Sequence, residues 1–386
     1  MKRSVKTQHL KVFLIVLILI NLLLWLILTK QKPIVVGNKI EVAEISAILN
    51  SNDQDYRRKE ARILAERVGP DKALELLKNS ALPFTGDSHL LVHEVGYVIY
   101  QRYGKDALLH CKDDFNFGCY HGVIITAASS NKEGLKYIKE MVDRCRGNWT
   151  KFAQCAHAVG HGLEAMWDYD LPKSLADCDK LFEGEVSYKN AVIHCHDGVF
   201  MENLFGLHDS GVRTSYQRKW LSDSDIYFPC DAVAEKYQQG CWYNQASRIY
   251  QMKDGNINMT ATACETLKNT DNKRWCFNNL ARQITSSTNN NIDKVFELCG
   301  ETGSSRKADC AIDTAVQYYA QGGRMKAIQI CKNPVGSFQN DCFKQIAPMI
   351  AVDTIISKSE KESLCGEIGD YKSECLIGVE KQARVN

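Results

Sequence analysis

Residues 299–342 read CGETGSSRKADCAIDTAVQYYAQGGRMKAIQICKNPVGSFQNDC, and this stretch contains the pattern that decides the fold. Cys299 and Cys310 are 11 residues apart, as are Cys331 and Cys342. Between the two pairs, a first run of residues ends at Gly322 and Gly323. A second, amphipathic run follows and ends at Cys331. Apolar residues recur in these runs at helical spacing, which predicts a helix, a turn and a second helix.

The same unit recurs along the chain, whose 16 cysteines fall into eight consecutive pairs. The first members of successive pairs are 32 to 35 residues apart, except for one step of 52 that contains an insertion. A period near 34 residues is typical of two-helix repeats. The pairs are Cys111/Cys119, Cys145/Cys155, Cys178/Cys195, Cys230/Cys241, Cys264/Cys276, Cys299/Cys310, Cys331/Cys342 and Cys365/Cys375.

The cysteines are expected to form disulfides between neighbouring repeats. Their number is even and the Cys-x-x-Cys spacing of zinc ribbons is absent, so an oxidising compartment explains them better than metal binding. Each pair would join the second helix of one repeat to the first helix of the next. Closing a loop of this size stabilises a fold by about 2–3 kcal/mol.

Residues 12–29 read VFLIVLILINLLLWLILT and contain no charged side chain. This length comes close to spanning a hydrocarbon core of about 30 Å. Lysines and an arginine precede the run, which predicts a cytoplasmic N-terminus and a translocated remainder. The alternative interpretation is a cleaved signal peptide, but no small-x-small cleavage site follows the run. We therefore expect a single-pass membrane protein whose C-terminal domain is periplasmic, extracellular or lumenal.

The predicted fold class is an all-α solenoid of helix hairpins with disulfides between repeats, preceded by one transmembrane helix. The net charge of +2 provides no basic surface for a nucleic-acid backbone, so no nucleic-acid partner is expected. The predicted organisation is a cytoplasmic tail over 1–11, an anchor over 12–29, a linker over 30–54, capping repeats over 55–110, histidine-rich repeats over 111–229 with an insertion at 203–229, and disulfide repeats over 230–386.

A helix-pair period near 34 with a cysteine at each junction resembles the Sel1-like and tetratricopeptide α/α repeat proteins. The likeness covers residues 60–386 and rests on period and cysteine placement. The tetratricopeptide Trp-Leu-Gly-Tyr-Ala pattern is not reproduced, and most repeats lack the Sel1-type glycine loop. The resemblance implies the architecture, and it also implies a concave face that binds a peptide or protein.

The histidines are concentrated in the first repeats, because nine of the ten lie between His89 and His208. Alignment on the second cysteine of each pair places His121, His157 and Asp197 at one position. In the cysteine-less cap, His93 aligns with them. The further candidates are His161, one helical turn after His157, His196, and the carboxylates Glu94, Glu164 and Glu202.

Equivalent histidines on neighbouring helices, which pack about 8–10 Å apart, can meet at one metal ion. We therefore predict a transition-metal site that uses His93, His121, His157, His161, His196 and Asp197, with Glu94 or Glu202 as general base or further ligand. Zinc, iron, copper and manganese all suit such ligands. The stretch HAVGH has the ligand spacing of the zinc-protease motif but an alanine in place of its general base, and HEVGY lacks the second histidine, so that activity is not implied.

Two alternatives stay open. Each histidine taken singly could be a buried structural residue, and Gly122, Gly160, Gly162 and Gly198 could serve only to let helices approach closely. The protein could also be a non-enzymatic scaffold that binds a peptide or protein partner at the membrane.

The insertion contains several aromatic residues, so it is either a lid or binding loop or an ordinary packed excursion.

Overall fold

The computed structural model describes residues 45, 48, 50–80, 86–130, 134–147, 149–185, 190–206, 219–288, 291–333, 338–353 and 355–383. Contacts divide the chain into Met1–Ser46 and Ala47–Asn386, and the fold described here is that of the second unit. The expected tail over 1–11, the expected anchor over 12–29 and most of the expected linker over 30–54 lie outside the described residues. Within the described ranges, no helix is both long enough and apolar enough to cross a membrane.

The described residues form α-helices and short 3-10 helices without a β-strand. Longer helices alternate with shorter ones, as a helix-hairpin repeat requires. The longer helices are α3 (Gln54–Val68), α5 (Gly86–Tyr103), α6 (Asp114–Ser130), α8 (Trp149–Met166), α10 (Ala191–Phe205), α11 (Glu235–Met252), α13 (Thr270–Ser287), α15 (Lys307–Ala320), α17 (Gln339–Val352) and α19 (Lys372–Ala383). The shorter ones are α4 (Pro70–Lys78), η1 (Gly104–His110), α7 (Leu135–Asp143), α9 (Leu171–Leu181), α12 (Ile257–Glu265), α14 (Ile292–Gly300), α16 (Arg324–Cys331), α18 (Lys358–Gly366) and η2 (Gly369–Tyr371).

Polar caps and amphipathic faces explain where these helices begin and which sides they bury. The side chains of Asn256, Asn269 and Asn291 accept hydrogen bonds from backbone N–H groups in the first turns of α12, α13 and α14. Ser357 and Glu360 form a reciprocal capping box at the start of α18. The short helices then bury one face, and in α7 the buried residues are Tyr137, Ile138, Met141 and Val142.

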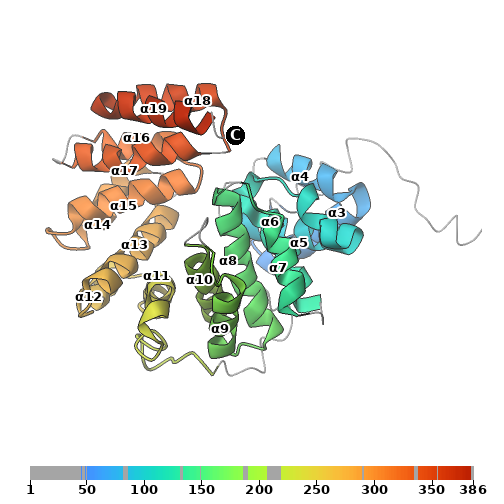
Figure 1. Cartoon of the computed structure of the whole chain (residues 1–386). Coiled ribbons are helices and arrows are strands. Elements are labelled where there is room, and N and C mark those ends of the chain that lie inside the picture. The colour runs from blue at the N-terminus through green and yellow to red at the C-terminus, as the bar shows by residue number, and fades with distance from the viewer. Residues whose placement is uncertain are drawn as a thin grey trace, which may run out of the picture. The chain divides into compact units, whose positions relative to one another are not determined.

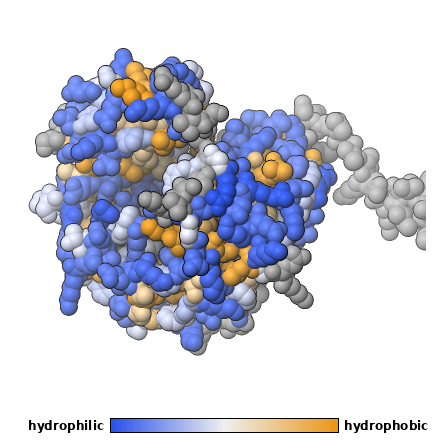
Figure 2. All heavy atoms as spheres, in the orientation of Figure 1, coloured by the Kyte–Doolittle hydropathy of each residue, from blue (hydrophilic) through white to orange (hydrophobic). Residues whose placement is uncertain are grey.

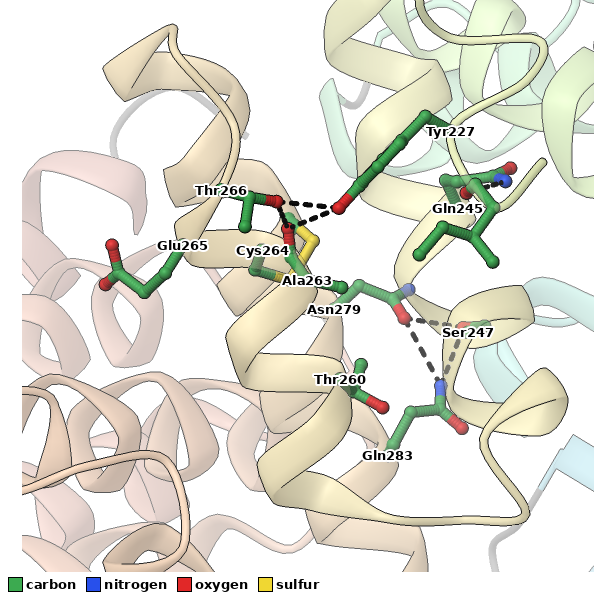
Figure 3. The surroundings of a disulfide bond; sticks show 12 residues. Tyr227, Gln245, Ser247, Thr260, Ala263, Cys264, Glu265, Thr266, Asn279 and Gln283 are labelled. Carbon is green, nitrogen blue, oxygen red and sulfur yellow. Dashed lines mark hydrogen bonds between the residues drawn. A yellow bond between two sulfur atoms is a disulfide. The ribbon is translucent and has the colours of Figure 1, made fainter.

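All eight predicted disulfides are confirmed, and no cysteine is free. In α14, for example, Cys299 bonds Cys310 near the start of α15, with 5.6 Å between their Cα atoms. Figure 3 shows the bridge that includes Cys264 in α12. Each bridge joins the segment before a long helix to that helix, and at Cys230 this segment is a turn and not a short helix. The disulfides thus fix the path of the chain from repeat to repeat.

Successive long helices pack against one another, from α5 on α6 to α17 on α19. In Figure 1 the pairs from α13 to α19 are seen stacked in chain order. The prediction of an all-α chain of repeating helix pairs is therefore confirmed for the described residues. Figure 2 shows a largely hydrophilic face in which hydrophobic residues form small separate patches. The apolar core is correspondingly internal, and its C-terminal part is continuous from Ala246 to Val379.

The insertion predicted over 203–229 begins later than expected, because α10 continues to Phe205. Residues 207–218 lie outside the described residues. The remainder is bound to the helices around it: Gln245 of α11 donates hydrogen bonds to the carbonyls of Ile226 and Phe228 at 2.7 and 3.0 Å. Tyr227 lies 2.6 Å from the hydroxyl of Thr266 (Figure 3). The described part of the insertion is thus a packed excursion.

Candidate metal centre

The three aligned histidines and Asp197 lie on four consecutive long helices, and each one is close to the next. His93 belongs to α5, His121 to α6, His157 to α8 and Asp197 to α10. The ring centroids of His93 and His121 are 5.4 Å apart, and those of His121 and His157 are 5.2 Å apart. His157 Nδ1 lies 2.9 Å from an oxygen of Asp197. The repeat therefore brings one position of four successive helices into a continuous row.

Three imidazoles converge at the α5–α6 end of this row. His89 Nε2 lies 2.8 Å from His93 Nε2 and 3.0 Å from His121 Nδ1. One nitrogen from each ring can be chosen so that all three lie within 4.8 Å of one another. Nitrogens bound at about 2.1 Å to one tetrahedral ion are roughly 3–3.4 Å apart, so small shifts would seat an ion between them.

The backbone fixes which nitrogen of His89 faces the cluster. Its Nδ1 lies 2.8 Å from the carbonyl oxygen of Phe115, and a carbonyl only accepts, so Nδ1 carries the proton. The lone pair of the neutral ring is then on Nε2, directed at His93 and His121. A hydrogen bond on the far nitrogen is the usual support of a metal-binding histidine.

Two further imidazoles, on α8, face each other at the next place in the row. His157 Nε2 and His161 Nε2 are 3.1 Å apart. Each ring is held from behind by a carboxylate: His157 Nδ1 by Asp197, and His161 Nδ1 by Glu202 at 3.0 Å. Glu202 also accepts a hydrogen bond from the Tyr169 hydroxyl at 2.9 Å. Both rings are thereby oriented with their Nε2 atoms together.

The charge of Asp197 follows from its neighbours. Burial alone would raise the pKa of this carboxyl, but His157 and a hydrogen bond of 2.6 Å from Asn244 hold the pKa below its ordinary value. His194, which lies near both Asp197 and His157, has a pKa lowered by burial. The carboxylate that holds His157 is therefore charged, and the neighbouring His194 ring is kept neutral by burial.

Glycines let the helices approach closely enough for these contacts. A Cβ on Gly122 would lie 2.1 Å from the His93 carbonyl oxygen. On Gly160 it would lie 2.1 Å from the Cys195 carbonyl oxygen, and on Gly198 it would lie 2.0 Å from the His157 carbonyl oxygen. Such distances exclude a side chain, so α5–α6 and α8–α10 pack backbone to backbone. The glycines therefore permit the close helix contacts, and these contacts bring the histidines together.

Two of the residues expected in the site lie elsewhere. Glu94 points away from the imidazoles to Arg58 and Arg62, and its contacts with Arg58 are 2.7 and 3.0 Å. His196 projects from another side of α10, with Nε2 2.9 Å from Asp179. Glu202 is in the site but orients His161. The reason is angular: successive residues of a helix point about 100° apart, so neighbours of a site residue face other elements.

His89 belongs to the cluster but was not among the candidates selected from the sequence. Its signal was available, because His89 and His93 have the same four-residue spacing as His157 and His161. Residues at i and i+4 share one helix face, so both pairs could have been recognised as two-nitrogen donors. Tyr169, Phe115 and Asn244 support the site from positions that no spacing rule connects to it.

A cavity of about 700 Å³ opens beside the histidines and follows the inward faces of the long helices as far as α15. At its distant end it is lined by Tyr243, Trp275, Arg282 and Gln317. Arg282 hydrogen-bonds Tyr243, and burial raises the pKa of Tyr243. Among the described residues no ion pair includes Arg282. The cavity thus combines several imidazoles with a cation and amide groups.

No protein-family model matches this chain, and no curated protein is significantly similar to it. Among solved structures, an engineered protein matches with 13% sequence identity and a TM-score of 0.22, covering 89% of this chain and 98% of that chain. A score this low carries no argument about fold or activity. What the site does therefore rests on its own geometry.

Proposed function

We propose that this protein is a metalloenzyme that binds a transition-metal ion through His89, His93 and His121. The observation that carries the proposal is the convergence of these three rings within 4.8 Å, with the far nitrogen of His89 held by a backbone carbonyl. Buried histidines with structural roles bond to carbonyls or carboxylates. These three imidazoles turn nitrogens toward one another, and imidazole nitrogen is a common ligand of transition metals.

Imidazole ligands suit zinc, iron and copper better than manganese, which prefers oxygen. Three protein ligands leave a coordination position open, as in catalytic zinc sites, where the ion holds a water molecule and lowers its pKa. The open side would face the 700 Å³ cavity, a volume within the usual range for small-molecule sites. We infer metal-activated attack by water on a polar substrate, with Arg282 providing a charge for an anionic group.

The compartment is part of the proposal. Eight disulfides suit an oxidising environment. The apolar run over 12–29 would anchor the protein in a membrane, with residues 1–11 in the cytoplasm and the repeats outside it. The repeats would form a solenoid of the kind seen in Sel1-like and tetratricopeptide proteins, with the metal on the inner face of its first repeats.

Metal analysis of the purified full-length protein tests the proposal. We expect stoichiometric transition metal after reconstitution, and loss of at least one equivalent in His93→Ala and in His121→Ala. His196→Ala is a matched control, because this buried histidine bonds Asp179 away from the cluster. Wild-type protein that binds no transition metal after reconstitution would refute the proposal.

The second candidate function is a scaffold for a peptide or protein partner at the membrane. The observation in its favour is the reach of the cavity along seven successive long helices, from α5 to α15. Under this function, His93→Ala and His121→Ala would lower only the melting temperature. Stoichiometric metal that is present in the wild type and lost in these variants would instead favour the metal site over a purely structural role of the histidines.

A further inference from the structure

His157 and His161 form an arrangement that the triad of His89, His93 and His121 does not use. Both rings are buried, and both have their Nδ1 atoms committed to carboxylates. Opposite an ionised carboxylate, which only accepts hydrogen bonds, Nδ1 is the nitrogen of the ring that carries the proton. In the neutral form of both rings, each Nε2 then has a lone pair, and the two lone pairs face one another across 3.1 Å.

Two lone pairs at this distance repel unless a cation lies between them. A divalent metal ion would satisfy both lone pairs at once while Asp197 and Glu202 balance its charge. Histidine with a carboxylate on its far nitrogen is a recurrent metal-binding unit, and the carboxylate makes the ring a stronger donor. Here two such units point at one place.

We infer that His157 and His161 hold a second transition-metal ion, next to the one proposed at His89, His93 and His121. This inference rests on the proposed function and extends it to a two-metal centre.

His121 lies between the two positions. Its Nδ1 faces His89, and its ring is 5.2 Å from the ring of His157 and 6.0 Å from that of His161. Its other nitrogen, Nε2, is buried. Two ions in one cavity would together bind an anionic substrate group more strongly than one ion.

Metal stoichiometry decides the inference. Full-length protein reconstituted with Zn²⁺ or Co²⁺ should contain two equivalents, and His161→Ala should contain one. Glu202→Gln keeps both rings and changes only the group behind His161. Its metal content therefore tests the second position even if the alanine variant does not fold. We expect Glu202→Gln to lower the affinity for one of the two ions by about 10–100-fold. Asp179→Asn, which changes the same kind of contact at His196, should leave both ions bound.

The same measurements distinguish failure of the second metal position from failure of the proposed function. One equivalent in the wild type, kept in His161→Ala and lost in His93→Ala, would overturn the second position and leave the proposed function intact. No metal in any of the proteins would overturn both. Two equivalents in the wild type and one in His161→Ala would establish the second position.

Discussion

Asp197 and Asp313 show how neighbours set the charge of a single residue. Both carboxyls are shielded from water, which raises a pKa, yet His157 and Asn244 hold the pKa of Asp197 below its ordinary value. At Asp313 of α15, burial and then the charge of Asp309 raise the pKa to about 7, against a weaker opposing effect of nearby arginines. Asp197 is therefore charged at neutral pH, whereas Asp313 titrates there.

Asp313 should make stability fall as the pH rises. Its pKa is about 7 when folded and about 3.9 when unfolded, so between pH 4 and 7 the folded state binds more protons than the unfolded state. The stabilisation present near pH 4 is lost by pH 8. Asp313→Asn removes this dependence, and we expect it to be more stable than the wild type by up to about 4 kcal/mol at pH 8, because each unit of pKa difference corresponds to about 1.4 kcal/mol. Denaturant titrations at pH 5 and pH 8 measure the difference, and an equal effect at both values would contradict the assignment.

At the scale of the elements, the site depends on how closely two helices approach. The α8–α10 contact passes through Gly160 and Gly198, where no Cβ fits, and the same helices contribute His157, His161 and their two carboxylates. The distance between helix backbones is thus set by glycine, and the distance between imidazoles and carboxylates follows from it.

Gly160→Ala should push α10 away from α8. The added methyl group would meet the Cys195 carbonyl and the Val199 amide of α10, and overpacking of this kind costs about 1–3 kcal/mol. We expect a lower melting temperature and weaker metal binding at His157 and His161. Gly300→Ala in α14 is the control, because nothing lies within 4 Å of its Cβ and alanine favours the helix. An unchanged metal content in Gly160→Ala would contradict the coupling between packing and site.

At the scale of the molecule, the described residues of the second unit form a row of locally bonded repeats. Every disulfide closes a loop of 8 to 17 residues between neighbouring elements, and each long helix packs mainly on the one before and the one after. In proteins of this kind, stability is close to a sum of repeat and interface terms, so damage to one repeat stays local.

Removal of the last disulfide should therefore leave the site intact. We expect the double variant Cys365→Ala, Cys375→Ala to lose about 2–3 kcal/mol within α18 and α19 and to keep its full metal content. Removal of Cys145 and Cys155, whose bridge ends two residues before His157, should lower metal content. Hydrogen exchange by mass spectrometry, with metal analysis of the same samples, measures both effects. Equal metal loss in the two variants would show that the repeats are coupled over the whole chain.

The sequence by itself determined the all-α repeat, its period and the pairing of every cysteine, because these depend on local spacing along the chain. It also selected His93, His121, His157, His161 and Glu202. The tertiary structure decided the roles. It added His89 to the cluster and placed Glu94 against Arg58 and His196 against Asp179. The reason is that a spacing rule gives the face of a helix, whereas only the packing of helices across close glycine contacts gives the direction and the partner of each side chain.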